Sequence, residues 1–368
     1  MPRVLLLATD LERGGLPLRL TRLAVRLPPL GIEPIVGCLA GEGPLHSTLR
    51  DAGIATFACG ARSSRDLIAV VRLARLIRGF RPDLIHASLL HANVAARLVG
   101  RLDRPRPILT ATVTIEIERA WHRWLECLTG SLSDVHLANS AAVAEHIQGD
   151  LGFPPEKVVM VPNGVDLAAI AAASPVNRQA GGLRDDLPLV IWAGRMDPVK
   201  DLFTWVEAVA FLRRRLPVQA VLLGDGPERP AVQRRIADLG LRDVIIVARW
   251  SDEVWSWLKA ADALLFTSRT EGSPNVVIEA MLCHCPIVAA DVPALRELIE
   301  PGRHGLLCPV GDTAAFAAGL ERILTQRVLA KEMAARAAER AAARHNLDHA
   351  AALLADLYHD LIRRYRSL

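Results

Sequence analysis

Glu271-Gly-Ser-Pro-Asn-Val-Val-Ile-Glu279 is the stretch of this 368-residue chain that says most about its fold and chemistry. It predicts a loop around Glu271, followed by a helix that begins near Asn275 and carries Glu279. Because the first NH groups of a helix have no partner within it, the start near Asn275 to Val277 can meet an anion. This arrangement suits a nucleotide-sugar: one carboxylate accepts hydrogen bonds from sugar hydroxyls, the other from the ribose, and the helix start receives the diphosphate.

Further motifs accompany this stretch along the chain: Val161-Pro-Asn-Gly-Val-Asp166, Gly194-Arg195 with Lys200, Gly224-Asp-Gly-Pro227, and Gly305-Leu-Leu-Cys-Pro309 before Gly311-Asp312. Glu271 to Glu279 resembles the E-x7-E signature of the retaining glycosyltransferases of family 4, and the other motifs, in their order along the chain, agree with this resemblance. The resemblance implies the α/β GT-B fold, in which two facing, doubly wound Rossmann-like domains have a cleft between them. The two glutamates alone would be a weak signal, because such pairs are usually solvated helix positions.

Length and composition are those of a two-domain globular protein. With 51% hydrophobic and 23% charged residues, the chain has ample material for two cores. Short apolar runs alternate with helical periods, which indicates parallel α/β units. We predict an acceptor-binding N-terminal domain over residues 1–170 and a nucleotide-sugar-binding C-terminal domain over 171–345, with a polar linker at Ala171–Asp186. The resemblance implies that a last helix, over 346–368, packs back on the N-terminal domain.

Several motifs follow predicted strands of the second half. Gly194-Arg195 follows the first of these strands, Gly224 ends the second, and Thr267-Ser268 ends the fourth. Ligands of doubly wound sheets bind at the carboxyl ends of the parallel strands. We therefore expect these residues at one edge of the sheet, in a single active site.

Cleavage of a nucleotide-sugar needs positive charge to stabilise the leaving diphosphate, and fixed cations and NH dipoles supply it without a metal. Arg195 and Lys200 are the best candidates, with the helix start after Pro274. The alternative is that Lys200 caps a turn and Arg195 pairs with Asp197. No D-x-D motif is present, so we expect no metal and no cofactor.

The two glutamates are assigned to the donor. Glu279 is expected to bind the ribose and Glu271 the sugar, while backbone NH groups near Gly272 to Asn275 hold sugar and phosphate oxygens. In the family, retention is usually explained by front-face attack, in which the leaving phosphate deprotonates the acceptor. The expected donor-binding residues are Gly14, Gly15, Gly194, Arg195, Lys200, Glu271, Gly272, Ser273, Pro274, Asn275, Val276 and Glu279.

In the N-terminal half, Gly14-Gly15 lies between the first strand and a helix, where glycine lets the backbone approach a ligand; a plain turn is the alternative. His86 and His91 join Glu271, Arg195 and Lys200 as candidate catalytic residues, because polysaccharide- and lipid-type members of the family carry a similar pair. A packed, hydrogen-bonded strand-end histidine is as good an interpretation of either. Thr114 stands where many members have a histidine that contacts the donor sugar, so His86, His91 or His122 takes that role or turnover is reduced or lost.

Six scattered cysteines include Cys283-His284-Cys285, whose spacing is too close for a usual zinc site and favours buried thiols in a reducing compartment. No signal peptide and no stretch of about 20 apolar residues is apparent. We expect a cytoplasmic protein.

The segment Arg62–Arg81 predicts a basic amphipathic helix with Arg65, Arg72, Arg75 and Arg78 on one side. Such a helix can contact the anionic surface on the inner face of the cell membrane. Each basic residue near that surface contributes about 1 kcal/mol of binding free energy. The alternative is an ordinary crossover helix with solvated arginines. Nucleic-acid binding is less attractive, because aromatic residues make up only 4% of the chain and none interleaves with these arginines.

The sequence thus predicts a retaining glycosyltransferase that moves a hexose or N-acetylhexosamine from a nucleotide-sugar to a polysaccharide, oligosaccharide or lipid-linked glycan. A UDP-sugar is favoured over GDP-mannose by family frequency. The alternative, suggested by Thr114, is a catalytically impaired partner protein that still binds a nucleotide-sugar. An epimerase fits poorly, because the Gly-Ser-Pro-Asn loop resembles the transferase version.

Overall fold

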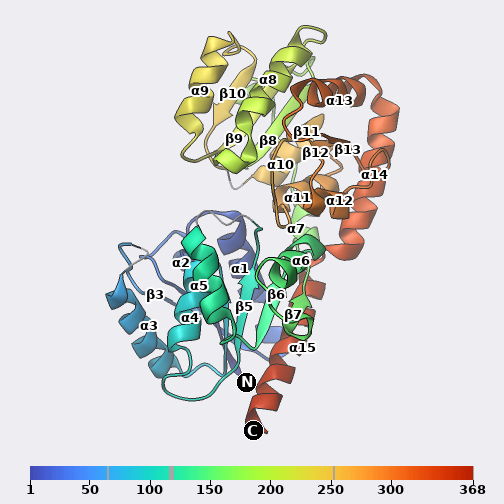
Figure 1. The fold of residues 1–368 in the computed structure, drawn as a ribbon. Coiled ribbons are helices and arrows are strands. Elements are labelled where there is room, and N and C mark those ends of the chain that lie inside the picture. Colours follow the sequence, from blue (N-terminus) through green and yellow to red (C-terminus); the bar gives the residue numbers. More distant parts are fainter. Residues whose placement is uncertain (64–65, 116–119, 252, 368) are drawn as a thin grey trace. The chain divides into compact units, whose positions relative to one another are not determined.

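The computed structural model describes residues 1–63, 66–115, 120–251 and 253–367, and it divides into two compact units. The first contains Met1–Gly164 and the C-terminal segment from Leu347, and the second contains Val165–Asn346 (Figure 1). The boundary predicted after residue 170 falls inside α7 (Leu167–Ala172). This helix belongs to the second unit because Ile170 is buried in that unit's core.

The first unit is built on a seven-stranded parallel sheet of order β3-β2-β1-β4-β5-β6-β7. Its strands are β1 (Arg3–Ala8), β2 (Glu33–Cys38), β3 (Ala55–Ala58), β4 (Leu84–Ser88), β5 (Ile108–Thr112), β6 (Val135–Ala138) and β7 (Val158–Met160). In the centre, Leu6 of β1 pairs with Val36 of β2 and with His86 of β4. The register therefore sets His86 in the middle of the sheet.

Helices cover both faces of this sheet: α1 (Gly15–Arg26), α2 (Leu45–Asp51), α3 (Leu67–Phe80), α4 (Leu90–Val99), α5 (Ala120–Gly130), α6 (Ala141–Gly149) and α15 (Leu347–Arg366). The 3-10 turns η1 (Pro28–Leu30) and η2 (Pro155–Lys157) complete the unit. Val4 and Leu6 face the core under α1, α2 and α15, whereas Leu5 and Leu7 face the core under α3 and α4. This alternation is what a strand buried on both faces requires.

The C-terminal helix α15 is part of the first unit's core, although more than 180 residues of chain separate it from β7. Its residues Ala351, Leu354 and Tyr358 are buried with side chains of β1 and α1. Tyr358 is fully buried, and its hydroxyl lies 2.5 Å from Nδ1 of His86. The helix thus contacts the central strand of the sheet directly.

The second unit repeats the plan with a six-stranded parallel sheet of order β10-β9-β8-β11-β12-β13. Its strands are β8 (Leu189–Arg195), β9 (Gln219–Asp225), β10 (Ile245–Ala248), β11 (Ala263–Phe266), β12 (Ile287–Ala290) and β13 (Leu306–Cys308). Besides α7, its helices are α8 (Leu202–Arg213), α9 (Arg229–Asp238), α10 (Val254–Ala260), α11 (Asn275–Leu282), α12 (Pro293–Leu298), α13 (Thr313–Thr325) and α14 (Arg327–Arg344), with the 3-10 turns η3 (Gln179–Gly181) and η4 (Pro198–Lys200).

In both sheets the strand order reverses beside the first strand, between β1 and β4 and between β8 and β11. This reversal defines the switch point at which doubly wound sheets bind ligands. The predicted fold class of two Rossmann-like, doubly wound parallel sheets is confirmed. The segment predicted as a linker, Ala171–Asp186, is tied to the second unit, because Arg178 Nη2 donates to Asp262 Oδ2 at 2.8 Å.

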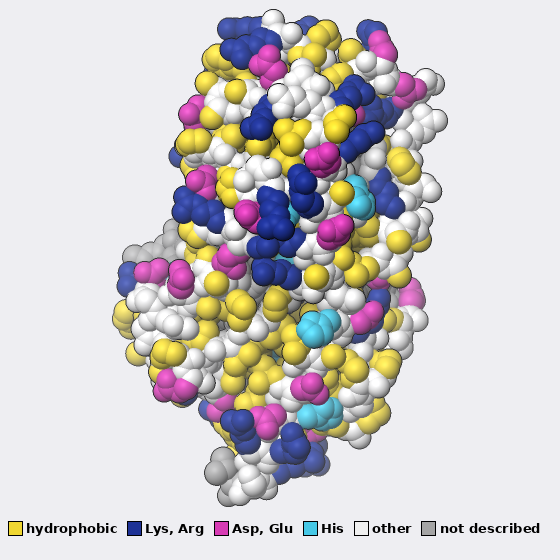
Figure 2. All heavy atoms as spheres, turned by 90° about the vertical axis from the view of Figure 1, so that its right-hand side faces the viewer, with side chains coloured by type: hydrophobic (Ala, Val, Ile, Leu, Met, Phe, Trp, Pro, Cys, Tyr) yellow, Lys and Arg dark blue, Asp and Glu magenta, His cyan; other side chains and the backbone are white. Residues whose placement is uncertain are grey.

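The surface differs in composition from these apolar cores. On the face shown in Figure 2, charged side chains of both signs lie among apolar ones. Among the described residues, no helix is both long enough and apolar enough to cross a membrane.

Candidate active site

An ion pair joins two of the predicted site residues of the second unit. Lys200 Nζ lies 2.6 Å from Glu271 Oε1, and the two side chains are only 20% and 10% exposed. Lys200 ends η4, which follows β8, and Glu271 lies in the loop between β11 and α11. Breaking such a pair leaves a largely buried charge without compensation, so each charge fixes the other in position.

Hydrogen bonds hold the two loops together. The buried Thr267, which follows β11, donates through Oγ1 to the carbonyls of Lys200 (3.0 Å) and Asp201 (3.1 Å). The backbone NH of Arg269 donates to the carbonyl of Val199 at 2.8 Å. The Lys200 loop is therefore attached to the end of the neighbouring strand, which is the predicted carboxyl edge of the sheet.

Glycine is needed where β8 and β9 end. Gly194 pairs with Gly224 across the two strands, and a Cβ on Gly224 would lie 1.9 Å from the Gly194 carbonyl oxygen. A Cβ on Gly226 would lie 2.6 Å from backbone atoms of Met196. Gly224 and Gly226 thus permit close approach of one backbone segment to another, whereas a Cβ on Gly194 would lie 3.2 Å from the Trp192 ring.

The start of α11 provides the predicted helix terminus. Pro274 precedes the helix and has no side-chain oxygen with which to cap it. The loop residues Glu271 and Gly272 are buried, and Ser273, Asn275 and Val276 are partly buried. Glu279 lies about one turn into α11 and is also partly buried. An anion at this terminus would meet the positive end of the helix dipole.

Arg195 is placed differently from Lys200. Its side chain is 76% exposed, and its Nε lies 3.0 Å from Asp197 Oδ2. The pairing with Asp197, which was the alternative interpretation of Arg195, is therefore present. The long, exposed side chain nevertheless remains at the end of β8, where it can turn toward a ligand.

In the first unit, Gly14 precedes α1 and Gly15 is its first residue. Gly14 has an extended backbone that any residue can adopt, and a Cβ there would meet only Pro17 Cδ at 3.7 Å. The internal packing of the described residues thus gives no reason for glycine at position 14. Space in front of α1 is what an approaching ligand would need.

His86 is buried, and its Nδ1 is paired with the Tyr358 hydroxyl; its Nε2 lies 3.5 Å from Ser88 Oγ. Burial, reinforced by the nearby positive charge of Arg19, lowers the pKa of His86 to about 3. The imidazole is therefore neutral at physiological pH. This packed, hydrogen-bonded histidine matches the structural alternative for His86.

His91 lies in the first turn of α4, and its ring is 5.8 Å from the ring of His122 and 6.3 Å from that of Trp121, both in α5. Thr114 is exposed two residues after the end of β5. The structure thus brings together His91 and His122, two of the three histidines considered for the role that Thr114 cannot perform. Gly14, Gly15, His91 and Thr114 belong to segments after strands of the first unit, and His86 lies inside β4. The other predicted residues belong to the second unit.

The two flanking cysteines of Cys283-His284-Cys285 are buried, and burial raises the pKa of Cys283 to about 12. Both residues are therefore protonated thiols at neutral pH. Within the described part of the chain, no three histidine, cysteine, aspartate or glutamate side chains are grouped as metal ligands would be.

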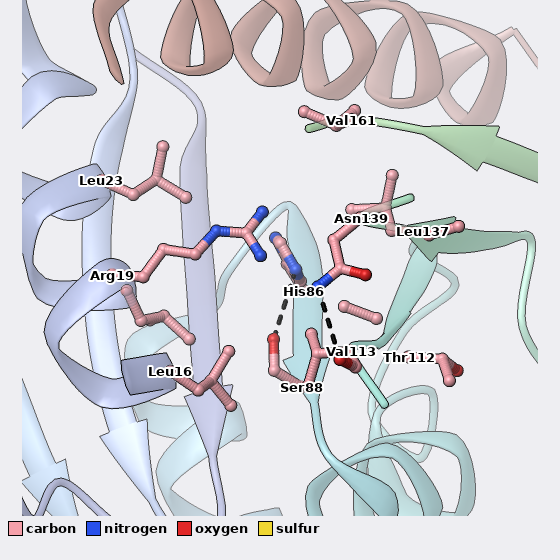
Figure 3. A pocket seen from close by; sticks show the side chains of 13 residues that line it. Leu16, Arg19, Leu23, His86, Ser88, Thr112, Val113, Leu137, Asn139 and Val161 are labelled. Atoms are coloured by element: carbon pink, nitrogen blue, oxygen red, sulfur yellow. Dashed lines mark hydrogen bonds between the residues drawn. The ribbon is translucent and has the colours of Figure 1, made fainter. Parts of the chain in front are cut away.

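A pocket at the carboxyl edge of the first sheet was not predicted. It is lined by residues of α1 and of the ends of β4, β5 and β6, and Arg19 of α1 points its guanidinium toward the side where His86 and Asn139 lie (Figure 3). The available signal was the position of Arg19 in the apolar stripe of Leu16, Leu20 and Leu23, where an arginine is unexpected.

The basic helix α3 packs through Ala69, Leu73 and Ile77, and Arg72, Arg75 and Arg78 are exposed. Arg65 lies outside the described residues. Arg72 Nη1 donates to the Cys59 carbonyl at 3.0 Å. The helix is therefore a crossover helix on the sheet, as the alternative interpretation has it, and its arginines face outward.

Comparison with known proteins gives two family matches and a shared fold. Residues 13–169 match Glycosyltransferase Family 4, and residues 187–326 match Glycosyl transferases group 1. HepE from Anabaena, solved in complex with UDP and glucose, superposes with a TM-score of 0.86 over 98% of this chain and 100% of that one. At 22% sequence identity, this likeness shows the fold.

Two curated relatives are similar in sequence. D-inositol 3-phosphate glycosyltransferase of Streptomyces bingchenggensis is 32% identical over 78% of this chain and 64% of its own length. Lipopolysaccharide core biosynthesis glycosyltransferase LpsE of Rhizobium meliloti is 30% identical over 56% of this chain and 58% of its own. The chain thus spans less than two thirds of the length of these relatives. Its two matched segments follow each other across both units, and the chain belongs to glycosyltransferase family 4, the glycosyl transferases of group 1.

Proposed function

We propose that this protein transfers a hexose or N-acetylhexosamine from a nucleotide-sugar to a glycan acceptor, with retention of configuration. The observation that carries the proposal is the ion pair of Lys200 and Glu271 beside the start of α11. A nucleotide-sugar needs a cation for its diphosphate and an acceptor for its sugar hydroxyls. These two side chains supply both within one hydrogen bond of each other.

The donor-site roles follow from charge and position. Lys200 and the NH groups at the start of α11 stabilise the negative charge that develops on the leaving diphosphate. Arg195 turns from Asp197 toward the same phosphates, since its side chain is exposed. Glu271 accepts from the donor sugar and Glu279 from the ribose. Lys200 and Arg195 supply the positive charge, so the reaction proceeds without a metal.

The donor is a UDP-sugar, a choice supported by the fold shared with HepE, which was solved with UDP. The acceptor is a polysaccharide, oligosaccharide or lipid-linked glycan; the similarity to LpsE of lipopolysaccharide core biosynthesis supports this class. The leaving phosphate takes the acceptor proton. His122 is the histidine nearest in sequence to Thr114, and it lies beside His91. This pair takes the role of a histidine there, whereas the neutral, buried His86 is held within the sheet by its contact with Tyr358.

Release of nucleotide from a panel of UDP-, GDP- and ADP-sugars, with and without a membrane lipid extract, tests the proposal. We expect release with one donor, abolished by Glu271→Gln and retained by the matched surface variant Glu332→Gln in α14. Nucleotide binding without release on any donor and extract would contradict the proposal and favour the impaired partner protein.

The protein also contacts an anionic membrane surface through α3. Three apolar residues at the start of this helix are strongly exposed: Leu67 (77%), Ile68 (64%) and Val71 (51%). They adjoin the exposed Arg72, Arg75 and Arg78. Apolar side chains that enter the interface, next to cations that meet the headgroups, are the two components of interfacial binding.

Sedimentation with vesicles tests this contact. The protein is expected to sediment with anionic vesicles and to stay in the supernatant with neutral vesicles. The double reversal Arg75→Glu with Arg78→Glu should abolish retention, whereas Arg234→Glu with Arg242→Glu, the same charge change at exposed positions of the second unit, should not. Equal loss in both double variants would mean that only net charge matters, and the contact through α3 would be wrong.

A further inference from the structure

The pocket of the first unit combines a buried positive charge with apolar walls. It has an empty volume of about 380 Å³, part of it open to solvent, and its apolar walls include Leu16, Leu23 and Val113. Among the described residues that line it, Arg19 is the one with a permanent charge, and none is acidic. The pocket therefore holds a net positive charge.

Arg19 lacks the acidic partner that Lys200 and Arg195 have. Lys200 is paired with Glu271 and Arg195 with Asp197, but the described residues offer the Arg19 guanidinium no hydrogen bond or ion pair. Burial lowers the pKa of Arg19 to about 10, an effect that Tyr358 partly offsets. At neutral pH the guanidinium is still protonated, and a partly buried cation without a counterion favours an anion beside it.

The groups around Arg19 are neutral and polar. His86 is uncharged at neutral pH, and Ser88 contributes a hydroxyl on the same side. Asn139 donates through Nδ2 to the Val113 carbonyl at 3.4 Å, while its Oδ1 has no hydrogen-bond partner among the described residues. Figure 3 shows these side chains around one space together with Arg19. They can bind an oxyanion and a neighbouring hydroxyl.

The pocket lies where the strands of the first sheet end. Ser88, Thr112 and Ala138 are the last residues of β4, β5 and β6, and all three line it. This is the edge at which a doubly wound sheet binds ligands, and Gly14 stands at the same edge, before α1. A ligand in the pocket would thus lie at the ligand-binding edge of the first unit.

We propose that this pocket is an anion subsite for the acceptor, in which Arg19 binds a carboxylate or phosphate group of a negatively charged glycan. That the ligand is an acceptor rests on the proposed function, whereas the binding of an anion by Arg19 does not. A planar guanidinium binds either oxyanion through two parallel hydrogen bonds. An acidic or phosphorylated sugar is then preferred over a neutral one.

Calorimetric titration of inorganic phosphate into the full-length protein tests the subsite. Arg19→Met keeps much of the side-chain volume and removes the charge, and we expect it to weaken phosphate binding roughly tenfold or more. Arg22→Met, on the same helix but not in the pocket lining, is the matched control and should bind as wild type does. Arg19→Lys should restore part of the affinity, and unfolding midpoints of all variants show whether the fold is kept.

Phosphate can also bind at the donor site of the second unit, so the same titration is made with Lys200→Met. Binding that survives Lys200→Met and is lost in Arg19→Met supports the subsite. Binding that Arg19→Met leaves unchanged, or that Lys200→Met alone removes, overturns it, as does the absence of binding.

Titration of glucuronate, glucose 6-phosphate and glucose then separates the two oxyanions. If one of the two anionic sugars binds more tightly than glucose and loses this advantage in Arg19→Met, its oxyanion is the group that Arg19 binds. Equal affinity for all three sugars overturns the preference for an anionic acceptor. Failure of the proposed function can be told apart from failure of the subsite. If no donor releases nucleotide but phosphate binding still depends on Arg19, the proposed function is wrong and the anion subsite stands.

Discussion

In the second unit the charged groups at the carboxyl edge of the sheet are paired with each other, whereas in the first unit Arg19 has no acidic partner in its pocket. Both edges belong to the same kind of doubly wound sheet. The paired edge fixes Lys200 and Glu271 before any ligand binds. The unpaired edge leaves a positive charge for a ligand to neutralise. The same fold thus holds paired charges at one sheet edge and an arginine without an acidic partner at the other, and we propose a ligand site at each.

The largest expected effect comes from breaking the pair. Lys200→Met removes the cation nearest the proposed diphosphate and leaves Glu271 largely buried without a partner. We expect kcat/KM for nucleotide release to fall by roughly 10²–10³, the cost of removing one group that stabilises developing charge. Steady-state kinetics measures it. Lys331→Met, at an exposed position of α14, is the control; equal rates in both variants would show that the pair has no part in the reaction.

A second comparison concerns the glycine that allows the edge of the second sheet to form. Gly224→Ala would bring a methyl group 1.9 Å from the Gly194 carbonyl oxygen. The backbone must shift, and we expect a loss of stability of about 1–3 kcal/mol or more, measured by urea unfolding.

Gly79→Ala is the control, because a Cβ there has open space at the end of a helix. It should stabilise the protein by about 0.5–1 kcal/mol, since alanine favours helix. Equal midpoints for the two variants would contradict the close approach of β8 and β9.

The buried histidine gives the first unit a dependence on pH. Burial and Arg19 lower the pKa of His86 to about 3, whereas an unfolded chain binds that proton near pH 6.5. Between these values the unfolded state binds more protons, so stability falls as the pH is lowered through this window. Burial, reinforced by Arg97, also lowers the pKa of His136 to about 3 and adds to the effect.

Urea unfolding between neutral pH and about pH 5 measures this dependence. His86→Gln should reduce it and leave the part due to His136, and His349→Gln, at an exposed position of α15, should leave it unchanged. A wild-type slope in His86→Gln would mean that His86 accepts a proton in the folded state.

The smallest expected effect concerns the hydrogen bond between α15 and β4. Tyr358→Phe keeps the buried ring and removes the hydroxyl that faces His86 Nδ1. We expect a loss of about 1 kcal/mol, typical of one hydrogen bond, in the same unfolding experiment. If the stability is unchanged, the contact does not help to hold the C-terminal helix on the first unit.

Much of the fold could be predicted because both sheets consist of buried parallel strands. The strands Ile108–Thr112, Val135–Ala138 and Ile287–Ala290 are short apolar runs between helical patterns, which is the alternation that indicated parallel α/β units. β3 is harder to recognise, because it has only four residues and lies at the edge of the sheet, where one side lacks a neighbouring strand. An edge strand carries a weaker apolar signal than a central one.

The site was predictable only in part. Motif spacing indicated Lys200 and Glu271, but their contact depends on two loops that lie 71 residues apart in the chain and meet through Thr267. Arg19 lay outside the prediction, because an arginine on an amphipathic helix usually reaches water. Its burial depends on residues of β4, β5, β6 and α15 that are distant in sequence, and the helix pattern signals only that an arginine stands within an apolar stripe.

The most direct test of the central claim, that Lys200 and Glu271 act as one donor-binding unit, is a double-mutant cycle on kcat/KM for nucleotide release. The variants are Lys200→Met, Glu271→Gln and the two combined. Because residues that act together are not additive, the double variant should be little slower than the more damaged single variant. Full additivity, with each substitution costing the same whether or not the other is present, would contradict the claim.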